Sequence, residues 1–188
     1  MVGIIWKPAD PKHDSRTPQE MTDMSDTSNN SPFNSGKNSG ARAMTMSGKP
    51  SGFRTLLGYR ASRWEPNYAE IELALEPKHM NSLGFTHGGL YLTLIDAAFG
   101  HAATWCSVPG NVRGVVTISL NTSFLSPAKG GIIRATGRLE GVHDRVATVS
   151  GDVRDERGLL LVTAIGSFRY FAGSEHVEGV AELPAPKS

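Results

Sequence analysis

Asp96 lies in the apolar stretch LYLTLIDAAFGHAATW, residues 90–105. A buried carboxylate without a partner costs roughly several kcal/mol of stability. A chain keeps such a group where its chemistry is needed, as a general base or as a nucleophile. The structural alternative is an Asp that bonds a neighbouring hydroxyl or backbone group. The apolar neighbours favour a catalytic carboxylate.

Gly88 and Gly89 come directly before this stretch and are expected to begin a helix. The first N–H groups of a helix lack intrahelical acceptors, and the helix dipole favours negative charge beside them. Glycines leave these donors open to approach, so they can stabilise an oxyanion. The same glycines also permit a tight turn into the helix, and the two roles are compatible.

The spacing of these groups constrains how they can act. Gly88 and Asp96 are eight residues apart, which is about 12 Å along a helix. One reacting carbon cannot touch both groups of a single chain. If both act on the same bond, one of them must come from a second subunit.

Two further polar residues precede the helix. The Asn81 amide can polarise a carbonyl, whereas His87 either braces the loop or contacts a substrate.

Other catalytic machinery is missing from the sequence. Cys106 is interpreted as a small core residue. The sequence has no phosphate loop, dinucleotide fingerprint, nucleophile elbow or metal-ligand spacing. We therefore expect neither a metal nor a separate cofactor.

The surrounding sequence predicts one long helix and six strands. Residues 53–60 predict a short helix leading into a strand, and 68–75 alternate as a strand with one wet face. The helix from residue 88 is apolar on every side, which predicts burial all round. Four strands in antiparallel succession are expected at 115–125, 132–142, 146–154 and 159–171. One helix on one sheet leaves edge strands open for a second copy.

Composition bounds the class of protein. The chain has 188 residues, 39% hydrophobic and 20% charged, with net charge +1, so no nucleic-acid or anionic-membrane surface is expected. One cysteine favours a reducing cytoplasm, and no apolar run is long enough for a membrane span. Residues 1–50, rich in Ser, Asn and Gly, predict a disordered tail. The domain is expected at 51–172 and a loose tail at 173–188.

The motifs NSLGFTHGG, LIDAAFG and TISLNTSFLSPAKGG resemble those of the hotdog-fold acyl-CoA thioesterases, in their PaaI-like phenylacetate-pathway branch. The resemblance runs over about residues 53–171. It implies an α+β fold in which a curved antiparallel sheet wraps one long helix. It also implies homodimers that pair into tetramers, and hydrolysis of an acyl-CoA thioester, with coenzyme A as part of the substrate.

The resemblance also assigns roles to residues. Asn81 and Gly88 match the groups that polarise the thioester carbonyl, and Asp96 of the other subunit matches the carboxylate that activates water or attacks directly. Thr117 falls where part of the family has a serine that orients the water, with an added methyl group here. His87 matches a supporting histidine.

Substrate contacts are expected on both sides of the thioester. The acyl group, either small and aromatic or of short to medium length, is expected against Leu83, Leu92 and Phe99. Gly89 is expected beside the carbonyl, and Lys129 and Arg145 near the CoA phosphates, although solvated surface charge is the alternative for these two.

Two other functions stay open for this fold. One is an acyl-thioester dehydratase or hydratase, which would use a histidine and an acid such as His87 and Asp96. The other is a non-catalytic acyl-CoA-binding protein. The helix-start glycines and Asn81 favour hydrolysis.

Overall fold

A computed structural model describes residues 51–184, and the tail predicted for residues 1–50 lies outside this range, as do residues 185–188. The predicted long helix and six strands are present, so the α+β class is confirmed. In chain order the elements are α1 (Gly52–Leu57), β1 (Arg60–Glu65), β2 (Tyr68–Ala74), the 3-10 turn η2 (Pro77–His79), α2 (Gly88–Thr104), β3 (Val115–Phe124), β4 (Ile132–His143), β5 (Val146–Asp155) and β6 (Leu160–Tyr170).

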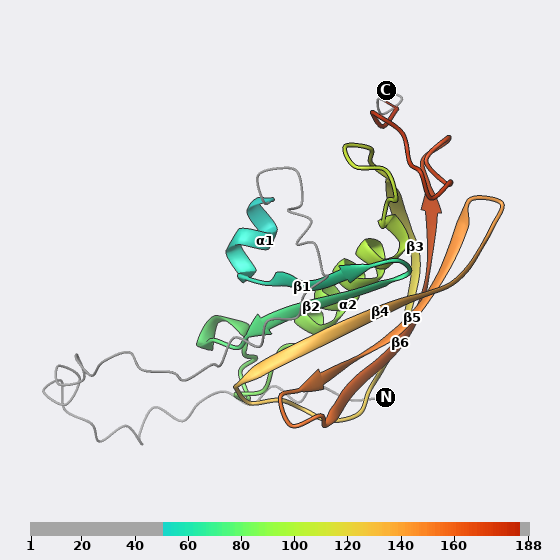
Figure 1. The fold of residues 1–188 in the computed structure, drawn as a ribbon. Helices are drawn as coiled ribbons and strands as arrows, with labels where there is room; N and C mark the ends of the chain where they lie inside the picture. Colours follow the sequence, from blue (N-terminus) through green and yellow to red (C-terminus); the bar gives the residue numbers. More distant parts are fainter. Residues whose placement is uncertain (1–50, 185–188) are drawn as a thin grey trace, which may run out of the picture. The chain divides into compact units, whose positions relative to one another are not determined.

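The six strands form one antiparallel sheet in the order β1-β2-β4-β5-β6-β3. The sheet wraps around α2, as Figure 1 shows. The four strands after the helix do not pair in simple succession, because β3 pairs with β6 rather than with β4. This places β3 at one free edge of the sheet and β1 at the other.

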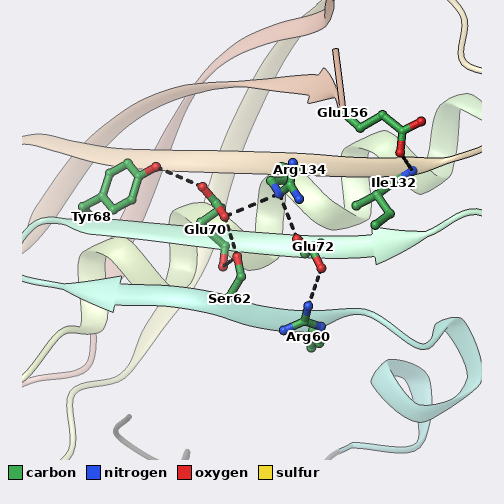
Figure 2. Close-up of polar contacts among 8 residues, drawn as sticks. All are labelled: Arg60, Ser62, Tyr68, Glu70, Glu72, Ile132, Arg134 and Glu156. Atoms are coloured by element: carbon green, nitrogen blue, oxygen red, sulfur yellow. Dashed lines mark hydrogen bonds and ion pairs between the residues drawn. The ribbon is translucent and has the colours of Figure 1, made fainter. Parts of the chain in front are cut away.

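Alternation on the strands gives the sheet one apolar and one charged face. On β2, Ala69, Ile71 and Leu73 are at most 2% exposed and face α2. Glu70 and Glu72 alternate with them on the outer face. There Arg134 Nε donates to Glu72 Oε2 at 2.8 Å, within the ion-pair network that Figure 2 shows. The outer face of β1, β2 and β4 is therefore polar.

Glycines let α2 lie close against the sheet. A Cβ atom on Gly137 of β4 would lie 2.6 Å from the Ala98 carbonyl oxygen. One on Gly166 of β6 would lie 3.1 Å from the Phe99 ring, which is completely buried. The distance at Gly137 is too short for a real Cβ atom, so a larger residue there would push the helix away from the sheet, whereas at Gly166 the Phe99 ring would have to shift.

The prediction that α2 is buried on all sides is wrong for the single chain. Its sheet-facing residues, such as Leu94 and Ala98, are fully buried. Leu92 on the opposite face is 37% exposed, and Asp96 is half-buried. The apolar composition of this open face is one reason to expect a cover from outside the chain.

The segment after β6 differs from the loose tail expected at 173–188. Ser174 is fully buried, and Val180 forms an antiparallel bridge with Val112. Arg113 donates to the carbonyl oxygens of Ser174 and Glu175 at 3.2 and 2.7 Å. These contacts hold residues 174–180 against the loop that follows α2, because the carbonyl groups of an irregular segment satisfy a half-buried guanidinium.

Candidate active site

Asp96 and Thr117 meet at the open face of α2. The Thr117 hydroxyl on β3 donates to Asp96 Oδ1 at 2.7 Å. Asp96 lies in the third turn of α2, and its side chain therefore projects from the middle of the helix toward the edge strand. The structure thus brings together two residues that the sequence placed in the site.

A cavity of about 640 Å³ opens beside this pair. Its size falls within the range of about 300–1,000 Å³ that is usual for small-molecule sites. Aromatic side chains from before and after α2 line it together with Asp96, among them Tyr59, Trp64 and Phe168. Asp96 therefore faces an apolar space with room for a ligand.

The start of α2 leaves one backbone donor open. His87 is the N-cap, and its Nδ1 accepts from Gly89 N at 3.0 Å. Leu90 N donates to the His87 carbonyl oxygen at 3.0 Å. The Gly88 N–H has no acceptor among residues 51–184, so it is the group that can hold a ligand oxygen. The Phe124 ring of β3 lies beside it, 3.7 Å from where a Cβ atom would stand.

This arrangement refines two sequence predictions. His87 braces the first turn of the helix through its ring nitrogen, and its supporting role in a reaction stays a prediction. The Gly89 N–H is occupied by His87, and a Cβ atom at this residue would lie 3.1 Å from the His87 ring. Gly89 shapes the helix start, and its N–H is not a donor for substrate.

Asn81 organises the turn that leads to the helix. Its Oδ1 accepts from the N–H groups of Leu83 and Phe85 at 2.9 and 3.1 Å. Its backbone also pairs with Phe85 and Gly84, so residues 81–85 form a closed turn. The carbonyl end of the side chain is thus used internally, which leaves the Nδ2 donor for a ligand.

The residues on either side of Gly88 and the residue Asp96 line different cavities of one chain. His87 and Gly89 line a smaller cavity of about 250 Å³, whereas Asp96 and Thr117 line the larger one. The helix between Gly88 and Asp96 is continuous. The separation of about 12 Å expected from the sequence therefore applies.

The residues predicted to contact the acyl group differ in their exposure. Phe99 is completely buried and packs edge-to-face against Phe168, so the prediction that it lines the acyl site is wrong. Its side chain lies one turn after that of the fully buried Ile95, on the sheet-facing side of the helix. Leu92 and Leu83 are 37% and 78% exposed and are free to contact a ligand or a second copy.

The two predicted phosphate contacts lie at opposite ends of β4. Lys129 precedes the strand and stacks over the Phe85 ring at 4.8 Å. Arg145 follows it in the hairpin turn, with φ +64°. A strand of 12 residues spans roughly 40 Å, so the two residues of one chain cannot hold the same phosphate group.

One wall of the cavity, formed by Tyr59, Trp64 and His101, was not predicted from the sequence. The Trp64 indole N–H donates to the His101 carbonyl oxygen at 2.7 Å, and the two rings meet edge-on at 5.6 Å. Burial raises the pKa of the Tyr59 hydroxyl, and the nearby Asp96 carboxylate adds to this rise. The only signal in the sequence was the position of His101, five residues after Asp96.

His101 is neutral in this wall. Burial lowers the pKa of its imidazole, although the hydrogen bond to Ala97 opposes the shift. Its Nδ1 lies 2.6 Å from the Ala97 carbonyl oxygen, which can only accept, so Nδ1 carries the proton. The ring is an uncharged, fixed part of the cavity wall.

Metal and thiol chemistry find no support in this part of the chain. Within residues 51–184, no three His, Cys, Asp or Glu side chains gather as a metal site. Cys106 is buried, and its thiol donates to the Glu178 carbonyl oxygen at 3.1 Å, as a core residue would. None of the described helices is long and apolar enough to cross a bilayer.

Comparison with known proteins agrees with this geometry. Residues 83–162, which span Gly88, Asp96 and Thr117, match the family model described as the thioesterase superfamily. The match covers less than half of the 188 residues, and over this region the chain is similar to that superfamily. The matched residues hold the open helix start, the carboxylate and the edge strand.

Two curated proteins align with this region over part of their lengths. Acyl-coenzyme A thioesterase 13 of Mus musculus is 38% identical over 64 residues, which are 34% of this chain and 44% of that protein. A Halobacterium salinarum protein with an esterase name is 34% identical over 93 residues, 47% of this chain and 62% of that protein. The chain thus spans less than two thirds of either relative.

A solved structure supports the fold of the domain. A point mutant of the phenylacetic acid degradation protein PaaI of Thermus thermophilus superposes with a TM-score of 0.55 at 22% identity. The match covers 63% of this chain and 98% of that one. At this identity the likeness shows the hotdog thioesterase fold.

Proposed function

We propose that this protein hydrolyses the thioester of an acyl-coenzyme A, with an active site shared between two copies of the chain. The observation that carries the proposal is the pairing of a carboxylate, Asp96, with the Thr117 hydroxyl at an apolar cavity. The thioesterase-superfamily match over the same residues supports it.

The open edge of the sheet supports a second copy. The exposed side chains of β3 include Val116, Ile118 and Phe124, each about half exposed at 48–54%. β3 has 10 residues, against six for the other edge strand, and its outer N–H and C=O groups have no neighbouring strand within residues 51–184. A long apolar edge strand favours pairing with another copy of itself.

The contacts of β3 suggest the register of this pairing. Thr117 touches Asp96, and Phe124 lies against Gly88, so the strand links both halves of the site. In a two-fold antiparallel pair of β3 strands centred near Asn121, the Thr117 end of one copy lies beside the Phe124 end of the other. Asp96 of one copy would then approach Gly88 of the second, which removes the distance problem within one chain.

The reaction follows from these groups. The carbonyl oxygen of the thioester accepts from the Gly88 N–H and the Asn81 Nδ2, which stabilise the negative charge that develops there. Asp96 of the second copy takes a proton from water while the water oxygen bonds to the carbonyl carbon. The carbon–sulfur bond then breaks, the carboxylic acid is released, and the proton passes to the CoA thiolate.

A second route uses the same residues. Asp96 attacks the carbonyl carbon directly, forms a mixed anhydride and releases CoA, and water then hydrolyses the anhydride. In both routes the Thr117 hydroxyl holds Asp96 Oδ1 and leaves the second carboxylate oxygen for the reaction. Neither route needs a metal or a separate cofactor.

Release of thiol from acyl-CoA esters tests the proposal. The panel consists of phenylacetyl-, hydroxybenzoyl-, hexanoyl-, decanoyl- and palmitoyl-CoA, assayed with a chromogenic thiol reagent. We expect wild type to release thiol from at least one ester and Asp96→Asn to lose at least about 100-fold in kcat, as when a catalytic base is removed.

The other possible outcomes favour the alternative functions. CoA esters that bind without thiol release from wild type would indicate a binding protein. A change in enoyl-thioester absorbance without free thiol, when 3-hydroxyacyl- or enoyl-CoA is supplied, would indicate a dehydratase or hydratase. Either result would overturn the hydrolase assignment.

A further inference from the structure

The cavity beside Asp96 extends toward the C-terminal end of α2. Asp96, Gly100 and Thr104 recur every four residues on one face of the helix, and all three line the cavity. Asp96 and Thr104 are separated by about 12 Å along the helix axis. The space therefore continues well beyond the carboxylate.

The lining of this space suits an acyl group rather than the CoA phosphates. Arg113 is the only Arg or Lys among its lining residues in the described part of the chain. Its guanidinium already donates to the carbonyl oxygens of Trp105, Ser174 and Glu175. This arginine is thus engaged with three backbone carbonyl groups, whereas Val112, Val115 and Phe168 offer apolar surface.

Leu183 closes the cavity near the start of β3. It lines the same space as Asp96, beside Phe171 and Gly114. A Cβ atom on Gly114 would lie 2.6 Å from Phe171 Cδ2 and 2.7 Å from Leu183 Cδ1. The two side chains therefore pack tightly over this glycine and leave no room at that end.

Leu183 is held in place by the segment before it, residues 171–183, which we call the C-terminal strap. The strap lies outside residues 83–162, which match the thioesterase superfamily. It is fixed by the Arg113 hydrogen bonds, by the Val112–Val180 bridge and by the contact of Cys106 Sγ with the Glu178 carbonyl oxygen. The end wall is thus supplied by residues that the superfamily match does not cover.

We propose that Leu183 sets the depth of the acyl cavity and thereby the longest acyl chain that the enzyme accepts. This inference rests on the proposed thioesterase activity. An acyl chain whose thioester carbon lies at Asp96 runs along Gly100 and Thr104 and ends against Leu183. Longer chains are rejected because the strap is anchored and the packing at Gly114 is already close.

The test compares Leu183→Ala and Leu183→Trp with wild type over saturated acyl-CoAs from hexanoyl to palmitoyl. Leu183→Ala should move the kcat/KM optimum to longer chains, by about fourfold for each methylene that the opened space admits. Leu183→Trp should move it to shorter chains. Leu159→Ala is the matched control, since this exposed leucine lies in the hairpin before β6.

Each outcome bears on a different part of the inference. An unchanged length profile in both variants, with wild-type turnover intact and melting temperatures near that of wild type, would overturn the role of Leu183 alone. A uniform rise in KM for every ester would also overturn it, because the cavity would then hold the part common to all esters. Absence of thiol release from wild type would overturn the proposed function and this inference with it.

Discussion

Asp96 meets a single side-chain donor among residues 51–184, the Thr117 hydroxyl, at 2.7 Å. A hydrogen bond to a charged group contributes about 1.5–3 kcal/mol, enough to hold the carboxylate in one orientation. The serine that the family resemblance led us to expect at this position is replaced by a residue with the same hydroxyl. The added methyl group leaves the hydroxyl able to reach the carboxylate.

Substitution of Thr117 tests this role. Thr117→Val removes the donor at nearly constant volume, and we expect kcat to fall about tenfold or more because Asp96 loses its orientation. Thr117→Ser keeps the donor and should stay within about threefold of wild type. Steady-state thiol release measures both. Equal loss in the two variants would show that side-chain shape, and not the hydrogen bond, determines the rate.

Candidate site residues were easier to select from the sequence than their roles were to assign. Asp96, Gly88 and His87 could be selected because their types are unusual at those places in an apolar or glycine-rich context, whereas Thr117 was selected only through the family resemblance. The use of the Asn81 carbonyl in its own turn could not be seen, since it depends on the fold of residues 81–85. Phe99 was misplaced because a helix that is apolar all round does not reveal which face meets the sheet.

At the scale of one element, α2 carries the two groups of the proposed reaction at different turns, the Gly88 N–H in the first and the Asp96 carboxylate in the third. In its first turn the Gly89 N–H donates to the His87 ring, and the Gly88 N–H has no acceptor among residues 51–184. Because His87 has ψ 133°, it already has the extended conformation that a residue before proline prefers. The first helical position also tolerates proline, since its N–H has no intrahelical partner.

This geometry permits removal of one backbone donor without loss of the helix. Gly88→Pro deletes the N–H, and we expect kcat to fall by about 10²–10³ with little change in melting temperature. Gly88→Ala keeps the N–H and is the control, since its Cβ would lie at an ordinary 3.7 Å from Phe124. Thiol release and thermal melting give the two readouts. Full activity of Gly88→Pro would exclude this N–H as the oxyanion donor.

Most elements followed from local sequence, but their pairing did not. Period-two alternation predicted β2, and the apolar run after Gly88 predicted α2. Succession along the chain predicted that β3 pairs with β4, whereas β3 lies at the edge beside β6. That choice depends on contacts between residues about 40–55 positions apart in the sequence, which local patterns do not encode.

At the scale of the whole molecule, the proposed site needs two copies. Asp96→Asn and Gly88→Pro each disable one half of every site. Co-expression of the two variants with different affinity tags yields mixed dimers in which one site has both intact halves. We expect these purified dimers to recover roughly half of wild-type kcat, because a two-fold dimer has two composite sites.

The same experiment can contradict the shared site. Each variant purified alone should stay inactive and serves as the baseline. Mixed dimers as inactive as the parents would show that Gly88 and Asp96 of one chain act together. Failure to isolate any mixed dimer would contradict the pairing of β3 edges.

Arg113 joins parts of the chain that are far apart in sequence. Its guanidinium binds the carbonyl after α2 and two carbonyls of the C-terminal strap, and it stacks on the Tyr170 ring at 4.6 Å. Fraying at such a joint is cooperative, so the strap cannot detach while the loop after α2 stays closed. Hydrogen exchange at Ser107, Val112 and Val180, whose amides bond across the joint, should therefore occur through one shared opening event. The C-terminal strap and the end wall of the proposed acyl cavity would therefore open together.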